Sequence, residues 1–115
     1  MSYFYLIFLA SNSNGVRCDE KNPPYIGCFS DDGNRDLSDG PKKYGYDQST
    51  CNEACKNYNY FALQAGGWCA CGDSYGNKPQ YKQKYDKECG GPRGMGKGWR
   101  NSIYKTCIKP GKYHS

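Results

Sequence analysis

The chain has 115 residues, a formal net charge of +5, eight cysteines, 15 glycines and 12 tyrosines, and 37% of its residues are hydrophobic. This length allows one small domain, and the composition is typical of a loop-rich scaffold whose modest core is reinforced by cross-links. A domain of this size leaves little depth for a substrate cleft, so we expect a protein that is not an enzyme and needs no cofactor.

The charge is unevenly distributed along the chain. Residues 1–72 carry a net charge of −2, whereas residues 73–115 carry +7. A basic half with interleaved tyrosines suits an anionic polysaccharide, a membrane surface or nucleic acid, although a solvated lysine-rich surface has the same composition. An extracellular address makes nucleic acid the least expected of these partners.

Residues 1–15 resemble a secretory signal peptide, because an apolar run over residues 3–10 is followed by small and polar residues. The small residues Ser13 and Gly15 suit cleavage before Val16. An apolar run of eight residues is too short to span a bilayer, so we expect a secreted, extracellular protein with no membrane span. A genuine N-terminal strand is the alternative.

Residues 25–29 are predicted to form the first strand, and residues 31–34 a turn. Residues 35–37 are expected to begin a short strand, with Leu37 directed inward and Arg35 available to pair with a carboxylate. The acidic residues of this region lack the spacing of a calcium loop, which favours turn chemistry over a metal site.

Residues 39–41 are expected to form another turn, followed by a helix over about residues 50–58 with Ser49 or Thr50 as its N-cap. β-Formers at 60–64 predict a strand, residues 65–67 a hairpin loop, and residues 68–71 the returning strand.

The polar stretch 72–88 is predicted to be an ordered loop. The glycine-rich run 90–98 lacks the motif of a phosphate-binding loop, so we expect it to be structural. Residues 102–104 are expected to form the closing strand, with Ile103 and Trp99 in the core. Residues 16–107 would then be a single domain, and residues 108–115 a flexible tail.

Four cysteines form two closely spaced pairs, Cys51/Cys55 and Cys69/Cys71. Residues four apart share one face of a helix at about 6 Å, and residues two apart share one face of a strand at a similar spacing. Because the second strand should run parallel to the helix, Cys51 is expected to pair with Cys69 and Cys55 with Cys71. The crossed pairing would need an antiparallel approach.

Zinc is the other interpretation of these cysteines. The C-x-C spacing suits a zinc knuckle poorly, and the single histidine, His114, lies near the C-terminus, so we expect no metal.

Several motifs in order resemble those of the WSC domain, a module of fungal cell-wall stress sensors that also occurs in animal extracellular proteins such as Kremen. The motifs are Tyr25-Ile-Gly-Cys28, Arg35-Asp-Leu37, the paired cysteines, Tyr60-Phe-Ala-Leu-Gln64, Cys71-Gly72 and Gly98-Trp-Arg-Asn-Ser-Ile-Tyr104.

This resemblance implies a small disulfide-rich α+β domain, with an antiparallel sheet packed on one α-helix as in PAN/apple modules, and a carbohydrate-binding role. It also implies the same two disulfides and a Cys28–Cys89 bridge. Cys18 and Cys107 lie outside the usual module, and we expect them to join the two ends of the domain. The family usually has a further cysteine pair before its closing Cys-Gly-Gly motif, which leaves the ligand loop near residues 90–98 undefined.

Aromatic stacking supported by basic side chains would suit recognition of a polysaccharide or glycoconjugate. The candidate ligand-binding residues are Trp68, expected to be exposed at the hairpin tip, and Tyr75, Asn77, Tyr44 and Tyr46; each aromatic could instead cover a disulfide. A structural or adhesive extracellular protein that self-associates is the alternative function, and a toxin-like secreted effector is a second.

Overall fold

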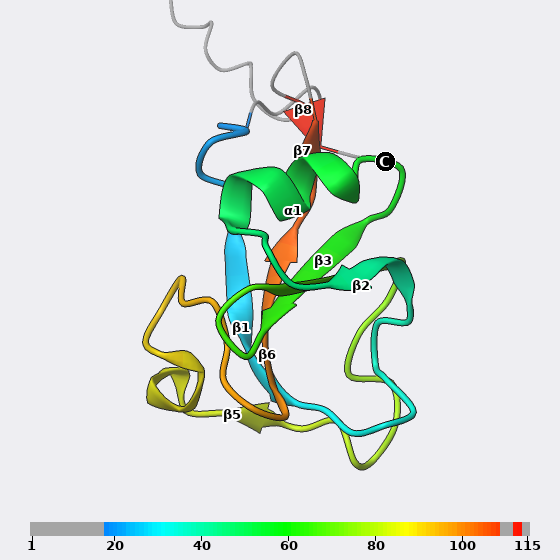
Figure 1. Ribbon diagram of the computed structural model, residues 1–115, viewed down its shortest axis with the longest axis vertical. Coiled ribbons are helices and arrows are strands. Elements are labelled where there is room, and N and C mark those ends of the chain that lie inside the picture. Colours follow the sequence, from blue (N-terminus) through cyan, green and yellow to red (C-terminus); the bar gives the residue numbers. More distant parts are fainter. Residues whose placement is uncertain (1–17, 109–111, 114–115) are drawn as a thin grey trace, which may run out of the picture.

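The computed structural model describes residues 18–108 and 112–113, and its centre is a six-stranded antiparallel sheet (Figure 1). The strands lie in the spatial order β2-β4-β3-β6-β1-β5. Their bounds are β1 (Tyr25–Ser30), β2 (Asp39–Lys43), β3 (Tyr60–Gln64), β4 (Trp68–Gly72), β5 (Gln83–Lys84) and β6 (Arg100–Lys105). The remaining elements are the helix α1 (Gln48–Ala54), the 3-10 helix η2 (Asp86–Cys89) and a small ladder of β7 (Cys107–Ile108) with β8 (Lys112–Tyr113). The expected α+β class is confirmed, whereas the predicted signal peptide over residues 1–15 lies outside the described residues.

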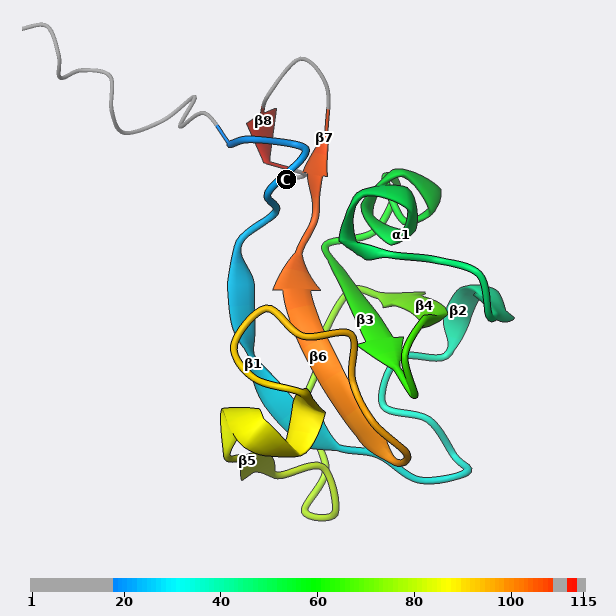
Figure 2. The same ribbon diagram turned by 60° about the vertical axis from the view of Figure 1, so that its left-hand side comes forward.

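Helix α1 covers one face of the sheet beside β3 and β4 (Figure 2). It begins and ends earlier than the predicted range 50–58, and its N-cap is Asp47 rather than Ser49 or Thr50. The carboxylate of Asp47 accepts the Thr50 amide at 2.9 Å, and the Thr50 hydroxyl accepts the Asp47 amide at 2.9 Å. This reciprocal capping box satisfies two polar groups at the helix start, which explains why the helix begins at residue 48.

The predicted hairpin of β3 and β4 forms the floor under the helix. Its register places Phe61 opposite Cys71 and Leu63 opposite Cys69, so all four side chains share the helix-facing side. Phe61 also stacks on Tyr104 of β6, with ring centroids 4.9 Å apart. Phe61, Leu63 and Tyr104 therefore form one buried core with the cysteines of α1 and β4.

All four predicted disulfides are present. Cys51–Cys69 and Cys55–Cys71 join α1 to β4, with Cα–Cα distances of 5.7 and 5.3 Å. Cys28–Cys89 ties β1 to η2, and Cys18–Cys107 joins the N-terminal segment to β7. No described cysteine is free.

Two predictions between β1 and α1 were wrong. Residues 35–37 form no strand, because Arg35 has a left-handed φ of 60° and turns the chain, although Leu37 is buried as expected. Residues 39–41, expected to be a turn, begin the edge strand β2, which pairs irregularly with β4. The edge position tolerates Pro41, which has no amide to donate. Gly40 at φ 85° leaves the space that the Cys71 sulfur occupies.

The second half of the chain supplies the middle of the sheet and one edge. The strand expected at 102–104 is β6, which lies between β3 and β1 rather than at an edge. The stretch 72–88, expected to be a loop, contains β5 and part of η2. Ile108, Lys112 and Tyr113, which fall in the stretch expected to be a flexible tail, belong to the β7–β8 ladder.

Candidate functional site

The face of the sheet opposite α1 carries a polar row across three strands. Trp68 of β4 lies opposite Gln64 of β3, which in turn lies opposite Asn101 of β6. The loop of residues 31–37 crosses this face, and Leu37 packs against small or branched side chains there, among them Ala62 and Ala70. This packing brings the loop's charged residues over the polar row.

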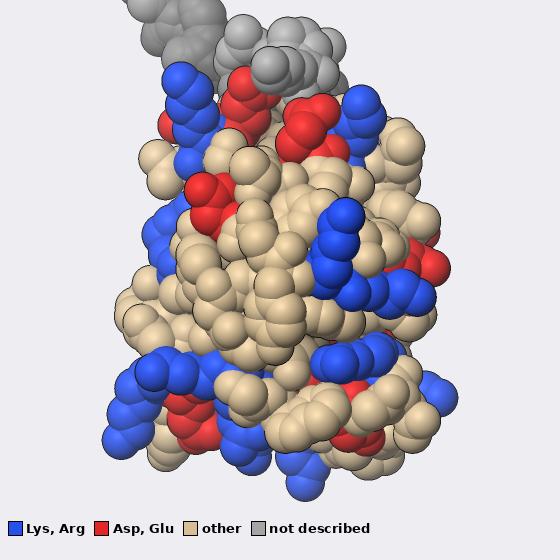
Figure 3. Space-filling model, in the orientation of Figure 1, with Lys and Arg blue, Asp and Glu red and all other residues tan. Residues whose placement is uncertain are grey.

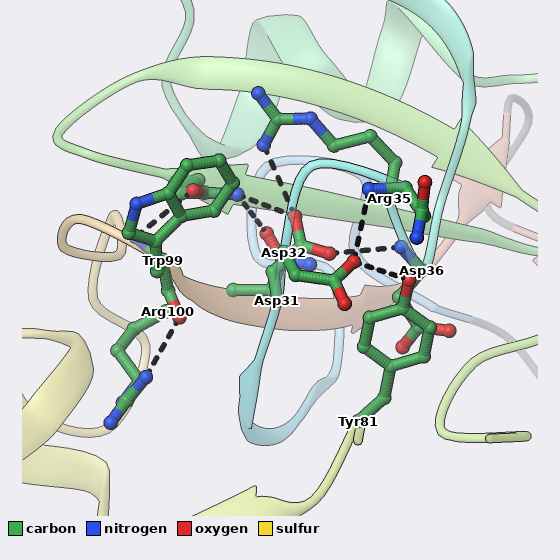
Figure 4. Close-up of polar contacts among 10 residues, drawn as sticks. Asp31, Asp32, Arg35, Asp36, Tyr81, Trp99 and Arg100 are labelled. Atoms are coloured by element: carbon green, nitrogen blue, oxygen red, sulfur yellow. Dashed lines mark hydrogen bonds and ion pairs between the residues drawn. The ribbon is translucent and has the colours of Figure 1, made fainter. Parts of the chain in front are cut away.

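Asp31 anchors the loop through a buried carboxylate whose side chain is only 1% exposed. It accepts hydrogen bonds from Arg35 Nη1 at 3.2 Å, from Gln64 Nε2 at 2.8 Å and from the Asp36 amide at 2.9 Å (Figure 4). Gln64 Nε2 also donates to Asn101 at 2.9 Å. A buried charge with a cationic partner and two further donors is well compensated, so this network fixes the loop on the sheet.

The Arg35 guanidinium group contacts two indole rings. Its central carbon lies 4.1 Å from the centroid of the Trp68 ring and 4.9 Å from that of the Trp99 ring. Both distances lie within the range of cation–π attraction. We call these three side chains the tryptophan–arginine stack; the expected pairing of Arg35 with a carboxylate is confirmed by its contact with Asp31.

The prediction that Trp99 lies in the core was wrong, because its side chain is 49% exposed. Lys97 and Arg100 exchange two backbone hydrogen bonds, which makes Trp99 the second central residue of a tight turn before β6. Its φ of 56° is a left-handed turn conformation, whereas a residue in a buried strand has an extended backbone with negative φ. The preceding Gly98 was the sequence signal for this turn.

Trp99 is nevertheless held rigidly by its backbone. Its amide donates to Gln64 Oε1 at 3.0 Å, and its carbonyl accepts the Asp31 amide at 3.1 Å. The same Gln64 and Asp31 that fix the loop therefore also fix the Trp99 backbone, and the Arg35 guanidinium group packs on the indole. A rigid exposed ring loses little conformational entropy when a ligand covers it.

Two further carboxylates lie near the stack (Figure 4). Asp32 accepts a 2.7 Å hydrogen bond from the buried Tyr81 hydroxyl, which lowers the pKa of Asp32. Burial, together with the negative charge of Asp32, raises the pKa of Tyr81 to about 12. Asp36 accepts the Gly76 amide at 2.8 Å, and burial raises the pKa of its carboxyl group.

The structure brings together only some of the candidate residues predicted from the sequence. Trp68 and Tyr75 are half-buried in the same hydrophobic cluster on the loop-covered face, where the Tyr75 ring contacts those of Phe29 and Tyr60. The prediction that Trp68 is exposed at the hairpin tip was therefore wrong, because its ring packs on this cluster and under Arg35. The other three lie elsewhere: Tyr46 packs against the helix-side core, Tyr44 is 64% exposed, and Asn77 is exposed after β4. Sequence reasoning assigned Trp99 to the core and did not foresee that Arg35 would join the two tryptophans.

Comparison with known proteins identifies a domain family that covers most of the sheet. The sequence profile of the WSC domain matches residues 25–96, which include all of the sheet except β6. A WSC domain-containing protein of Arthroderma benhamiae is 36% identical over 61 residues, a match that covers 50% of this chain and 8% of that protein. The chain thus spans less than a tenth of that relative's length. Neither helix in the described part of the chain has the length and apolar character needed to cross a lipid bilayer.

Proposed function

The chain belongs to the WSC domain family, and we propose that it acts outside the cell as a non-catalytic carbohydrate-binding module that uses the tryptophan–arginine stack. The exposed yet rigidly held indole of Trp99 carries this proposal. Sugars present apolar C–H faces that stack on indole rings, and their hydroxyl groups pair with nearby polar side chains. The dense disulfide framework is consistent with an oxidising, extracellular location.

The surroundings of the stack favour a glycan without negative charge. Asp32 and Asp36 offer carboxylate oxygens that accept hydrogen bonds from sugar hydroxyls but repel acidic sugars. The positive charge of Arg35 is already compensated by Asp31 at 3.2 Å. A neutral polysaccharide stacked on Trp99, with Arg35 extending the platform toward Trp68, is the ligand that these groups recognise best.

A glycan array on the wild-type domain, followed by affinity gel electrophoresis with the neutral glycans that bind, tests this function. Trp99→Ala should abolish binding because it removes the platform, while Trp68→Ala should weaken it by displacing Arg35. Tyr85→Ala, which removes an exposed ring on η2's N-cap residue, is the matched control and should bind normally. Unchanged glycan binding by Trp99→Ala contradicts the proposal.

Failure of every glycan to bind, combined with size growth at rising concentration, would instead support the adhesive, self-associating alternative. The sequence candidates Tyr44, Tyr46 and Asn77 do not belong to the stack and stay predictions. Single alanine variants of these three residues in the same gels would show whether any of them contributes to binding.

A further inference from the structure

An open hollow of about 560 Å³ lies beside β5 and η2, and none of the residues that line it belongs to the tryptophan–arginine stack. It is lined by Gln83, Lys84, Tyr85 and Glu88. Its volume is within the range of small-ligand sites in proteins. We call it the β5–η2 hollow.

The charge around this hollow is positive, because Lys84, Lys87 and Arg100 carry three positive charges against the two negative charges of Asp86 and Glu88. Asp86 accepts a 2.7 Å hydrogen bond from Tyr25, and Glu88 accepts a 2.7 Å charged hydrogen bond from Arg100. By contrast, among the residues that the structure describes, neither Lys84 nor its neighbour Lys87 takes part in an ion pair. Neither lysine is therefore held in a close ion pair, and Figure 3 shows basic side chains, with acidic ones between them, over the lower part of the molecule, where Figure 1 places β5.

Tyr85 adds an aromatic surface to this basic hollow. Its side chain is 76% exposed, the largest exposure among the large hydrophobic side chains of the described residues. The Lys87 ammonium group lies over its ring, 6.0 Å from the centroid, so an aromatic surface and a cation occur together. This combination recognises a ring-shaped ligand that carries negative charge.

We propose that the β5–η2 hollow is a second binding site, which takes an acidic polysaccharide. Tyr85 stacks on a sugar ring, and Lys84 and Lys87 pair with its carboxylate or sulfate groups. A concave site with one ring platform suits a sugar chain better than the flat surface of a membrane. The site differs in charge from the tryptophan–arginine stack, so the two sites select different glycans.

Affinity measurements with dextran sulfate and polygalacturonate, and with dextran as the uncharged counterpart of the first, test this site. Wild-type protein should bind the two acidic polymers at low salt, with binding weakening as salt rises, and any binding of dextran should not depend on Lys84 and Lys87. The double variant Lys84→Gln/Lys87→Gln should weaken binding about tenfold, since two exposed charge pairs are lost. The matched control Lys42→Gln/Lys43→Gln removes two exposed lysines from β2, at the opposite edge of the sheet, and should change affinity less than about twofold.

Two aromatic variants distinguish binding in the hollow from binding at the stack. Tyr85→Ala should also weaken binding of the acidic polymers, whereas Trp99→Ala should leave it unchanged even if it abolishes binding of neutral glycans. An equal loss in both lysine variants would overturn the proposal, because binding would then reflect diffuse positive charge. Lysine-dependent binding to phosphatidylserine vesicles without binding to either acidic polymer would also overturn it, in favour of a lipid surface.

Discussion

Replacing Trp99 by alanine should remove the proposed platform at a modest cost in stability. A tryptophan side chain can bury about 150–250 Å². Because about half of this one is covered, the change removes roughly 100 Å² of buried apolar surface. At about 25 cal/mol per Å² this amounts to roughly 2.5 kcal/mol, which is an upper estimate because the unfolded chain also buries some surface. The expected loss of about 1.5–2.5 kcal/mol is smaller than the 3–5 kcal/mol typical of a fully buried aromatic.

Replacing Trp99 by glycine should be no more destabilising than replacing it by alanine. The φ of 56° costs a residue with a side chain about 1–2 kcal/mol, and glycine escapes this cost. Glycine also gains about 0.5–1 kcal/mol of freedom in the unfolded chain, so the glycine variant should be as stable as the alanine variant or more stable by up to about 1.5 kcal/mol. If φ were negative at this position, the glycine variant would be less stable than the alanine variant.

Denaturant unfolding of wild type, Trp99→Ala and Trp99→Gly measures these differences, and thermal midpoints should shift by about 4–8 °C per kcal/mol for a domain of this size. The unfolding curves should show that both variants are folded. Affinity gel electrophoresis with a neutral glycan on the same samples should show that neither variant binds it. A loss of about 4 kcal/mol or more in Trp99→Ala, or a glycine variant clearly less stable than the alanine variant, would refute the placement of Trp99 as an exposed residue in a left-handed turn.

Three further changes test other parts of the domain. The hydrogen bond from Tyr81 lowers the folded-state pKa of Asp32, so it contributes stability above about pH 4. This contribution is lost as the pH falls through the lowered pKa. The difference in thermal midpoint between wild type and Tyr81→Phe should therefore shrink from about pH 6 to about pH 2. Gly96→Ala should destabilise strongly, by more than about 2 kcal/mol in denaturant unfolding, because φ is 77° and a Cβ would collide with main-chain oxygens of β3 and β6. Asn52→Ala should cost about 1–3 kcal/mol in the same assay, since its buried amide bonds both the carbonyl (2.7 Å) and the amide (2.8 Å) of Cys107.

The two disulfides between α1 and β4 were predictable because their geometry is local, whereas Cys28–Cys89 was expected only from the family resemblance. The spacing of Cys51 and Cys55 matches one helical face, and that of Cys69 and Cys71 matches one strand face, so chain direction alone selected the pairing. The helix start was harder, since Asp47, Ser49 and Thr50 are all good N-cap residues. Only the reciprocal hydrogen bonds distinguish Asp47 as the cap.

The site was less predictable because it depends on contacts between distant parts of the chain. Trp68 was proposed as a ligand-binding residue from its place beside the hairpin loop, but Trp99 was assigned to the core because it lies close to an apolar strand. Arg35 reaches both rings only because the loop leaves the expected strand path at a left-handed φ and is held by the buried Asp31. No periodicity in the sequence encodes that turn.

The disulfide between Cys18 and Cys107 governs how the domain responds to a mechanical pull. Its two Cα atoms lie 5.9 Å apart although 89 positions separate them along the chain. Tension applied through the segments on either side passes across this covalent link and bypasses the sheet. Under oxidising conditions the sheet, the stack and the hollow would therefore keep their shapes while the chain around them is stretched. Reduction of this one bond would transfer the load to the hydrogen bonds of the fold, and single-molecule pulling with and without a reductant would show the difference as a gain in extension.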